Sequence, residues 1–131
     1  MISDFTRTAV PQLVGHELEY SKAQHEEKFH SLHEAESVIR EELEELEEQA
    51  EVCRKLFEDL HSDTRQDDKA GAVINAKYLA GSATYAAYEA IQLAAMCEKL
   101  VLLPTRQNGR FAVTAIIHTV ATATRSRKDE R

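Results

Sequence analysis

Three glutamates, Glu41, Glu42 and Glu45, form an E-E-x-x-E pattern within an acidic part of the chain. On an α-helix, carboxylates three or four residues apart lie on the same side, since each turn takes 3.6 residues. A group of carboxylates provides the oxygen ligands that the hard cations Mg²⁺ and Mn²⁺ prefer. The alternative is a solvated helix surface, which we assign to the neighbouring glutamates, Glu44, Glu47, Glu48 and Glu51.

A second polar pair, Glu89 and Gln92, lies among apolar residues further along the chain. An ionised group on an apolar helix face is unfavourable unless a partner compensates its charge. If the two segments form an antiparallel helical hairpin with its tip at Asp67, Glu45 faces Glu89 and Glu42 faces Gln92. Glutamates that converge in this way repel each other unless a proton or a cation lies between them. A cation between the facing carboxylates is therefore one interpretation of this arrangement, and a solvated helix surface is the other.

The hairpin requires two long helices, and the sequence predicts two more beside them. Pro11 is suited to open a first helix, and Ser31 with Glu34 has the S-x-x-E spacing of a capping box. The polar segment 61–68 is expected to be the turn, and Pro104 ends the third helix. We therefore expect an all-α bundle with four main helices, at about 11–28, 31–60, 69–103 and 110–125.

Two of these helices carry open alternatives. The segment 110–125 is rich in β-branched residues, so a strand competes with the helix that its apolar spacing favours. The helix at 69–103 is apolar on two faces, which places it in the centre of the bundle or at a subunit interface. We expect self-association, as a homodimer or a tetramer.

The overall composition describes one domain, 1–131, with a net charge of −7. The negative charge disfavours nucleic acid as a partner, because such proteins normally present a basic face. No run of eighteen apolar residues is present, so we expect no membrane span. Cys53 and Cys97 lack a metal-ligand spacing and are predicted to be buried thiols, which suits a cytoplasmic protein.

The two polar motifs resemble those of the MazG-like all-α nucleoside triphosphate pyrophosphohydrolases, especially the phage and prophage members. The resemblance rests on the segments 40–46 and 88–96 and covers about 18–101, leaving 104–131 as an unassigned C-terminal extension. Two departures stand out. Gln92 takes the place of an aspartate in the second motif, and the connection between the motifs is longer than in the family.

The resemblance implies Mg²⁺-dependent hydrolysis of a nucleoside triphosphate to a monophosphate and pyrophosphate, with Mn²⁺ as a possible substitute. It implies that Glu42, Glu45 and Glu89 bind the metal, with the Gln92 carbonyl as a weaker donor. It also implies catalytic roles for Glu41, Glu42 and Glu45, with Glu41 as an outer ligand or the general base. Lys77 or Lys99 would bind the phosphates, although each is also consistent with a surface lysine. We interpret His25, His30 and His33 as surface groups or as groups near the helix cap.

Gln92 leaves a second function open. A helical oligomer that keeps this fold but has little or no turnover would act as a nucleotide-binding or assembly module. The intact E-E-x-x-E pattern favours the enzyme, and the missing aspartate favours the binding module.

Overall fold

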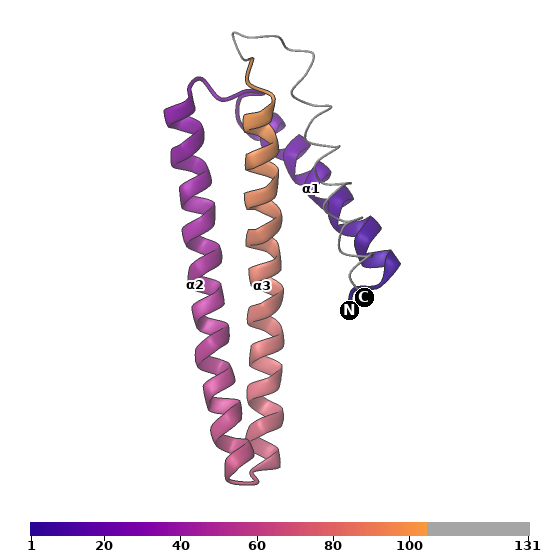
Figure 1. Cartoon of the computed structure of the whole chain (residues 1–131), viewed down its shortest axis with the longest axis vertical. Coiled ribbons are helices and arrows are strands. Elements are labelled where there is room, and N and C mark those ends of the chain that lie inside the picture. Colours follow the sequence, from indigo (N-terminus) through magenta and orange to yellow (C-terminus); the bar gives the residue numbers. More distant parts are fainter. Residues whose placement is uncertain (105–131) are drawn as a thin grey trace, which may run out of the picture. The chain divides into compact units, whose positions relative to one another are not determined.

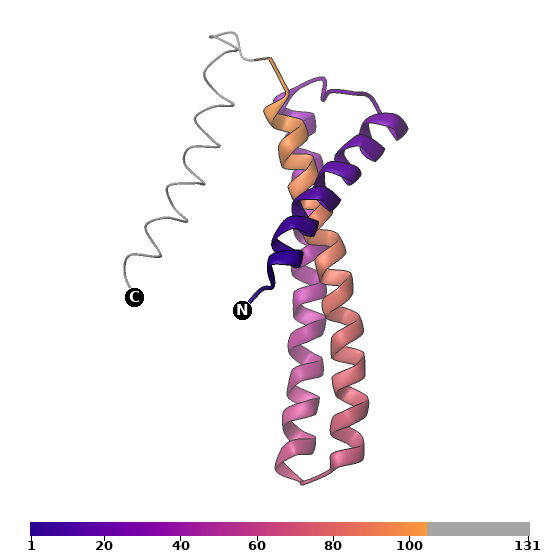
Figure 2. The same cartoon turned by 90° about the vertical axis from the view of Figure 1, so that its right-hand side faces the viewer.

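The computed structural model describes residues 1–104, and the site lies in the unit Met1–Leu100. Three helices make up the described part, α1 (Asp4–Gln24), α2 (Leu32–Arg65) and α3 (Lys69–Val101), with no strand among these residues. In Figures 1 and 2, α2 and α3 lie side by side and are joined by the turn at 66–68. The all-α prediction is confirmed for this part, and the helix predicted at 110–125 lies outside it.

Helix α1 begins seven residues before the predicted start at Pro11. The Ser3 hydroxyl caps the helix by accepting from the Thr6 N–H at 3.2 Å. Pro11 lies inside the helix, where its ring nitrogen has no hydrogen to donate to the preceding turn. The predicted end at Lys28 is also wrong, because the chain becomes extended at His25.

The predicted start of α2 is confirmed. The Ser31 hydroxyl accepts from the Glu34 N–H at 3.1 Å, and the Glu34 carboxylate accepts in return from the His30 N–H at 2.6 Å. The first bond satisfies a backbone donor that the first turn of the helix leaves free, and the second pairs the N–H of the residue before the cap. The carboxylate thus reaches one residue further back than in the standard capping box.

The turn between α2 and α3 is shorter than the predicted polar segment 61–68. Helix α2 continues to Arg65, because polar side chains do not by themselves end a helix. The reversal is made at Asp67, whose φ of 55° is a left-handed conformation that aspartate tolerates. Asp68 then caps α3 by accepting from the Gly71 N–H at 3.0 Å. Helix α3 ends at Val101, two residues before the predicted end.

Small and polar side chains join α2 to α3 along their length. Ala35 and Ala95 are completely buried, which allows the elements around them to approach closely. Further along, the Cys53 thiol donates to the Ser82 hydroxyl across a distance of 3.4 Å. Near the turn, the Asn75 side-chain amide donates to Asp63 at 2.6 Å. These contacts hold the two helices together away from the apolar core.

The apolar core gathers at the end of the unit where α1 meets the other helices. Helix α1 contacts this core through Ser21, whose hydroxyl lies 3.9 Å from the sulfur of Met96 on α3. Both of these side chains are buried, so α1 covers this end of α3. Among residues 1–104, the buried apolar side chains are Val14, Phe29, Ala35, Ala95 and Met96.

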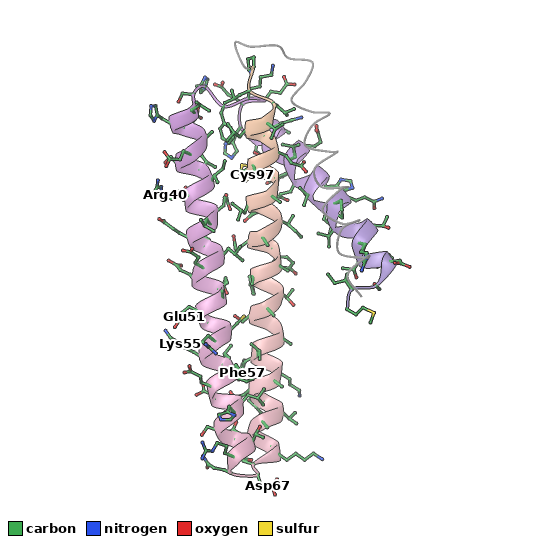
Figure 3. The ribbon with its side chains drawn as sticks, in the orientation of Figure 1. Arg40, Glu51, Lys55, Phe57, Asp67 and Cys97 are labelled. Carbon is green, nitrogen blue, oxygen red and sulfur yellow. The ribbon has the colours of Figure 1, made fainter. Side chains whose placement is uncertain are left out.

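The other part of α3 leaves apolar surface exposed. Tyr78 and Tyr85 expose 64% and 60% of their surface, and no described residue covers them. Helix α3 is therefore not the centre of a bundle within residues 1–104. The prediction that both cysteines are buried is wrong, because Cys97 is exposed and Cys53 is only partly buried. Cys97 follows buried Met96 directly, so its side chain points about 100° away around the helix. Figure 3 marks Cys97 on α3.

Within the described residues, no helix has both the length and the apolar character needed to cross a membrane.

Candidate metal centre and adjoining cavity

Three carboxylates converge between α2 and α3. Glu42 and Glu45 lie one turn apart on α2, and Glu89 approaches them from α3. One oxygen from each of these side chains lies within 4.8 Å of the other two. Glu42 and Glu89 are half-buried, whereas Glu45 is exposed. We call these three residues the carboxylate cluster.

Two oxygens of the carboxylate cluster lack any partner. Oε2 of Glu42 and Oε2 of Glu89 are closed off from solvent and receive no hydrogen bond from residues 1–104. Buried acceptors are nearly always paired, so two orphaned oxygens at one place require an explanation. A proton or a cation shared by the cluster would supply the missing partner.

The pKa values of both half-buried carboxyls are raised. For Glu42 the main cause is burial, followed by the negative charges of Glu45, Glu89, Glu41 and Glu17. For Glu89 the cause is again burial first, and then the Glu45 carboxylate, which would accept a hydrogen bond from protonated Glu89 and repels its ionised form. The full negative charge of the cluster is therefore unfavourable in the absence of a cation. An all-oxygen donor set with excess negative charge fits Mg²⁺ or Mn²⁺.

A cavity of about 410 Å³ adjoins the carboxylate cluster. Glu42 and Glu45 belong to both, whereas Glu89 does not line the cavity. This volume lies within the range of pockets that hold small molecules. All three helices and the loop between α1 and α2 contribute to its wall, which consists of Glu17, Tyr20, Ser21, His25, Phe29, Glu34, Val38, Glu41, Glu42, Glu45, Gln92, Met96 and Lys99.

Most of the residues singled out from the sequence are at this place. Glu41 is exposed and lines the cavity. Gln92 also lines the cavity and lies one turn from Glu89 on α3. The structure separates the two candidate lysines, because Lys99 lines the cavity and Lys77 is an exposed residue outside it.

The basic and imidazole groups near the motif lie mainly on the surface. Arg40 points away from α3 (Figure 3) and pairs with Glu36. His30 pairs with Glu26 at 2.7 Å, and both side chains are largely exposed. His25, His30 and His33 are all exposed, as the sequence predicts, and His25 also lines the cavity.

Sequence reasoning missed the contribution of α1. Glu17, Tyr20 and Ser21 line the cavity, and the charge of Glu17 helps to raise the pKa of Glu42. In the structure Glu17 lies three residues after buried Val14 and four before buried Ser21, but the sequence alone does not show which residues of this helix are buried. That spacing places a carboxylate on the inward face of the helix.

No family model, curated protein or solved structure matches this chain. The resemblance to the MazG-like enzymes therefore rests on the two motifs.

Proposed function

We propose that this chain is a MazG-like, Mg²⁺-dependent nucleoside triphosphate pyrophosphohydrolase, which forms a nucleoside monophosphate and pyrophosphate. The observation that carries the proposal is the pair of orphaned oxygens, on Glu42 and Glu89, beside a cavity of nucleotide-compatible size. The carboxylate cluster needs a positive charge to offset its own repulsion. A phosphate chain in the cavity would also be repelled by the glutamates unless a positive charge lay between them. A divalent cation meets both needs at once.

Each acidic residue has a distinct role in this proposal. Glu42, Glu45 and Glu89 hold Mg²⁺, or Mn²⁺ in its place, and Gln92 adds a neutral oxygen donor. When bound, the ion offsets the phosphate charge and polarises the bond to be cleaved. Glu41 is exposed and lines the cavity, so its carboxylate can accept a proton from a water molecule entering from solvent. Glu41 is thus the proposed general base.

The proposal includes the scaffold that the motifs imply. In it, α2 and α3 form the long antiparallel hairpin, and the protein is a cytoplasmic homodimer or tetramer. The exposed apolar surface of α3 supports self-association, since Tyr78, Tyr85 and Tyr88 are each more than half exposed.

A second function is favoured by one residue. Gln92 provides no negative charge where the family motif has aspartate, which weakens the attraction for Mg²⁺. A nucleotide-binding or assembly module with little turnover would need less tight metal binding than an enzyme. Turnover measurements separate the two functions.

The test is hydrolysis by the full chain, with the products identified. Nucleoside triphosphates are incubated with Mg²⁺ or Mn²⁺, and monophosphate and pyrophosphate are separated from diphosphate and orthophosphate. We expect monophosphate and pyrophosphate in equal amounts, and a loss of activity of about 100-fold or more in Glu45→Gln. Glu48→Gln is the matched control, because Glu48 is an exposed glutamate of α2 outside the cluster. Absence of turnover with every nucleotide would refute the enzyme, as would orthophosphate as the product.

A further inference from the structure

Lys99 is a buried cation whose charge is only partly compensated. Its side chain lies in the last turn of α3, and the residue is only 4% exposed. Its ammonium lies 4.8 Å from the centre of the Phe29 ring, a cation–π contact. It takes part in none of the ion pairs or side-chain hydrogen bonds formed within residues 1–104. A ring face accepts no conventional hydrogen bond, so the three N–H donors of the ammonium remain available.

These donors are available to a ligand, because Lys99 lines the same cavity as the carboxylates. Burying an ammonium is unfavourable unless acceptors replace the water that it loses. An acceptor on a molecule held in the cavity would provide this compensation. Phe29 is itself 94% buried, and its ring holds the ammonium in place at the cavity wall.

Lys99 lies well away from the carboxylate cluster. Ten residues separate Glu89 from Lys99 on the same helix, which corresponds to about 15 Å along the axis. The side chain leans back towards the start of the helix, which shortens this distance only in part. A phosphate group bound at the cluster therefore leaves Lys99 beside a more distant part of the same ligand. In a nucleotide, the distant part beyond the ribose is the base.

The wall around Lys99 also suits a base better than a phosphate chain. Phe29, Met96 and Tyr20 supply aromatic and thioether surface, and Ser21 supplies a hydroxyl. Flat aromatic ligands stack on such surfaces, whereas a multiply charged phosphate chain would need more than one cation. Lys99 is the one lysine or arginine among the residues that line the cavity within the described part of the chain.

We propose that the Lys99 end of the cavity is a nucleobase pocket, in which the ammonium donates to an exocyclic carbonyl oxygen of the base. This inference rests on the proposed function, because it assumes that a nucleotide places its phosphates at the cluster. An ammonium has donors and no acceptor, so it binds best to a base that presents a carbonyl oxygen, which is a stronger acceptor than the ring nitrogens that every purine carries. Uracil, thymine, guanine, hypoxanthine and cytosine carry at least one exocyclic carbonyl oxygen, whereas adenine carries none and offers only ring nitrogens as acceptors. Adenine nucleotides are therefore the poor ligands of this site.

The test measures binding and needs no turnover. Calorimetric titration of the full chain with UMP, GMP and AMP, in the presence of Mg²⁺, gives the preference for each base. We expect UMP and GMP to bind at least about ten times more tightly than AMP, because a hydrogen bond to a charged group contributes about this much to affinity. In Lys99→Met, which keeps the length and apolar stem of the side chain, UMP and GMP should fall to the affinity of AMP. Lys55→Met, at an exposed position of α2 (Figure 3), should leave all three unchanged.

Several results would overturn the nucleobase pocket. Equal affinity of the wild type for all three nucleotides would do so without any variant, and so would a complete absence of binding. An equal loss for UMP, GMP and AMP in Lys99→Met would show that Lys99 contacts the phosphate or the ribose. If Lys99→Met does not fold, as judged by its melting curve, the wild-type ranking still decides.

The two proposals fail in different ways. Base-dependent binding without any turnover would refute the hydrolase and leave the pocket. Turnover of all nucleoside triphosphates at one rate, with equal affinities, would refute the pocket and leave the hydrolase.

Discussion

Replacing Glu42 with glutamine should stabilise the metal-free protein, which is unusual for a substitution at a half-buried position. Each full charge in the carboxylate cluster lies within 4.8 Å of two others, and each such pair repels by about 0.9 kcal/mol or more in water. Glu42→Gln removes two of these pairs. The pair with Glu45 persists in part in the unfolded chain, since the two residues are neighbours in sequence. We therefore expect the free energy of unfolding to rise by about 1–2 kcal/mol at low salt.

The assay is thermal unfolding at pH 8, first with a chelator and then with Mg²⁺. For a chain of this size, about 1–2 kcal/mol corresponds to a rise in Tm of about 3–10 °C. Mg²⁺ at about ten times its Kd should stabilise the wild type by about 1.4 kcal/mol. Glu42→Gln has lost a metal ligand and should gain less from Mg²⁺, so the wild type should become about as stable as the variant. Glu48→Gln, outside the cluster, should behave as the wild type within about 0.5 kcal/mol. The reasoning is refuted if Glu42→Gln is no more stable than the wild type without metal, or if Mg²⁺ raises both Tm values equally.

Three further changes test other parts of the account. Folding raises the pKa of Glu42 and Glu89 above the ordinary value of 4.5, so the folded state binds more protons than the unfolded state. Without metal, the stability of the wild type should therefore increase relative to that of Glu42→Gln as the pH falls from 8 towards 4.5. A constant difference between the two urea midpoints over that range would contradict this. Gln92→Asp should bind Mg²⁺ about ten times more tightly than the wild type and, without metal, should melt at a lower temperature than the wild type. Weaker Mg²⁺ binding by the variant in calorimetry would mean that Gln92 lies outside the ligand set. Ser31→Ala should lower the free energy of unfolding by about 1 kcal/mol in urea titrations, because the Glu34 N–H loses its acceptor, and a loss below about 0.3 kcal/mol would contradict a stabilising cap at Ser31.

The parts of the fold that local chemistry determines were predictable. Ser31 and Glu34 mark the start of α2, because both capping bonds are made within four residues. The end of α2 was not predictable from polarity, since the reversal depends on the backbone conformation of Asp67. The start of α1 was missed because Pro11 was taken as a first-turn proline, although Ser3 also offered a cap.

The carboxylate cluster illustrates how far spacing can lead. Glu42 and Glu45 share a helix side by periodicity, and the position of the turn brings Glu89 to them. The part of the cavity wall on α1 could not be predicted in this way. Its position depends on the contact between Ser21 and Met96, which are 75 residues apart in the sequence.

The choice between the two candidate lysines also required the structure. Lys77 and Lys99 lie on one helix, and nothing in their sequence neighbourhoods distinguishes a surface lysine from a buried one. Lys99 is buried because Phe29, on the loop between α1 and α2, lies over this end of α3. That contact joins residues from two distant segments, so no local pattern reveals it.

The central claim is that the carboxylate cluster is a divalent cation site. Calorimetric titration of the full chain with Mn²⁺, after treatment with a chelator, tests this claim most directly. We expect one saturable site per chain, weakened about tenfold or more in Glu45→Gln and in Glu89→Gln and unchanged in Glu48→Gln. No saturable binding, or the same affinity in all four proteins, would contradict the claim.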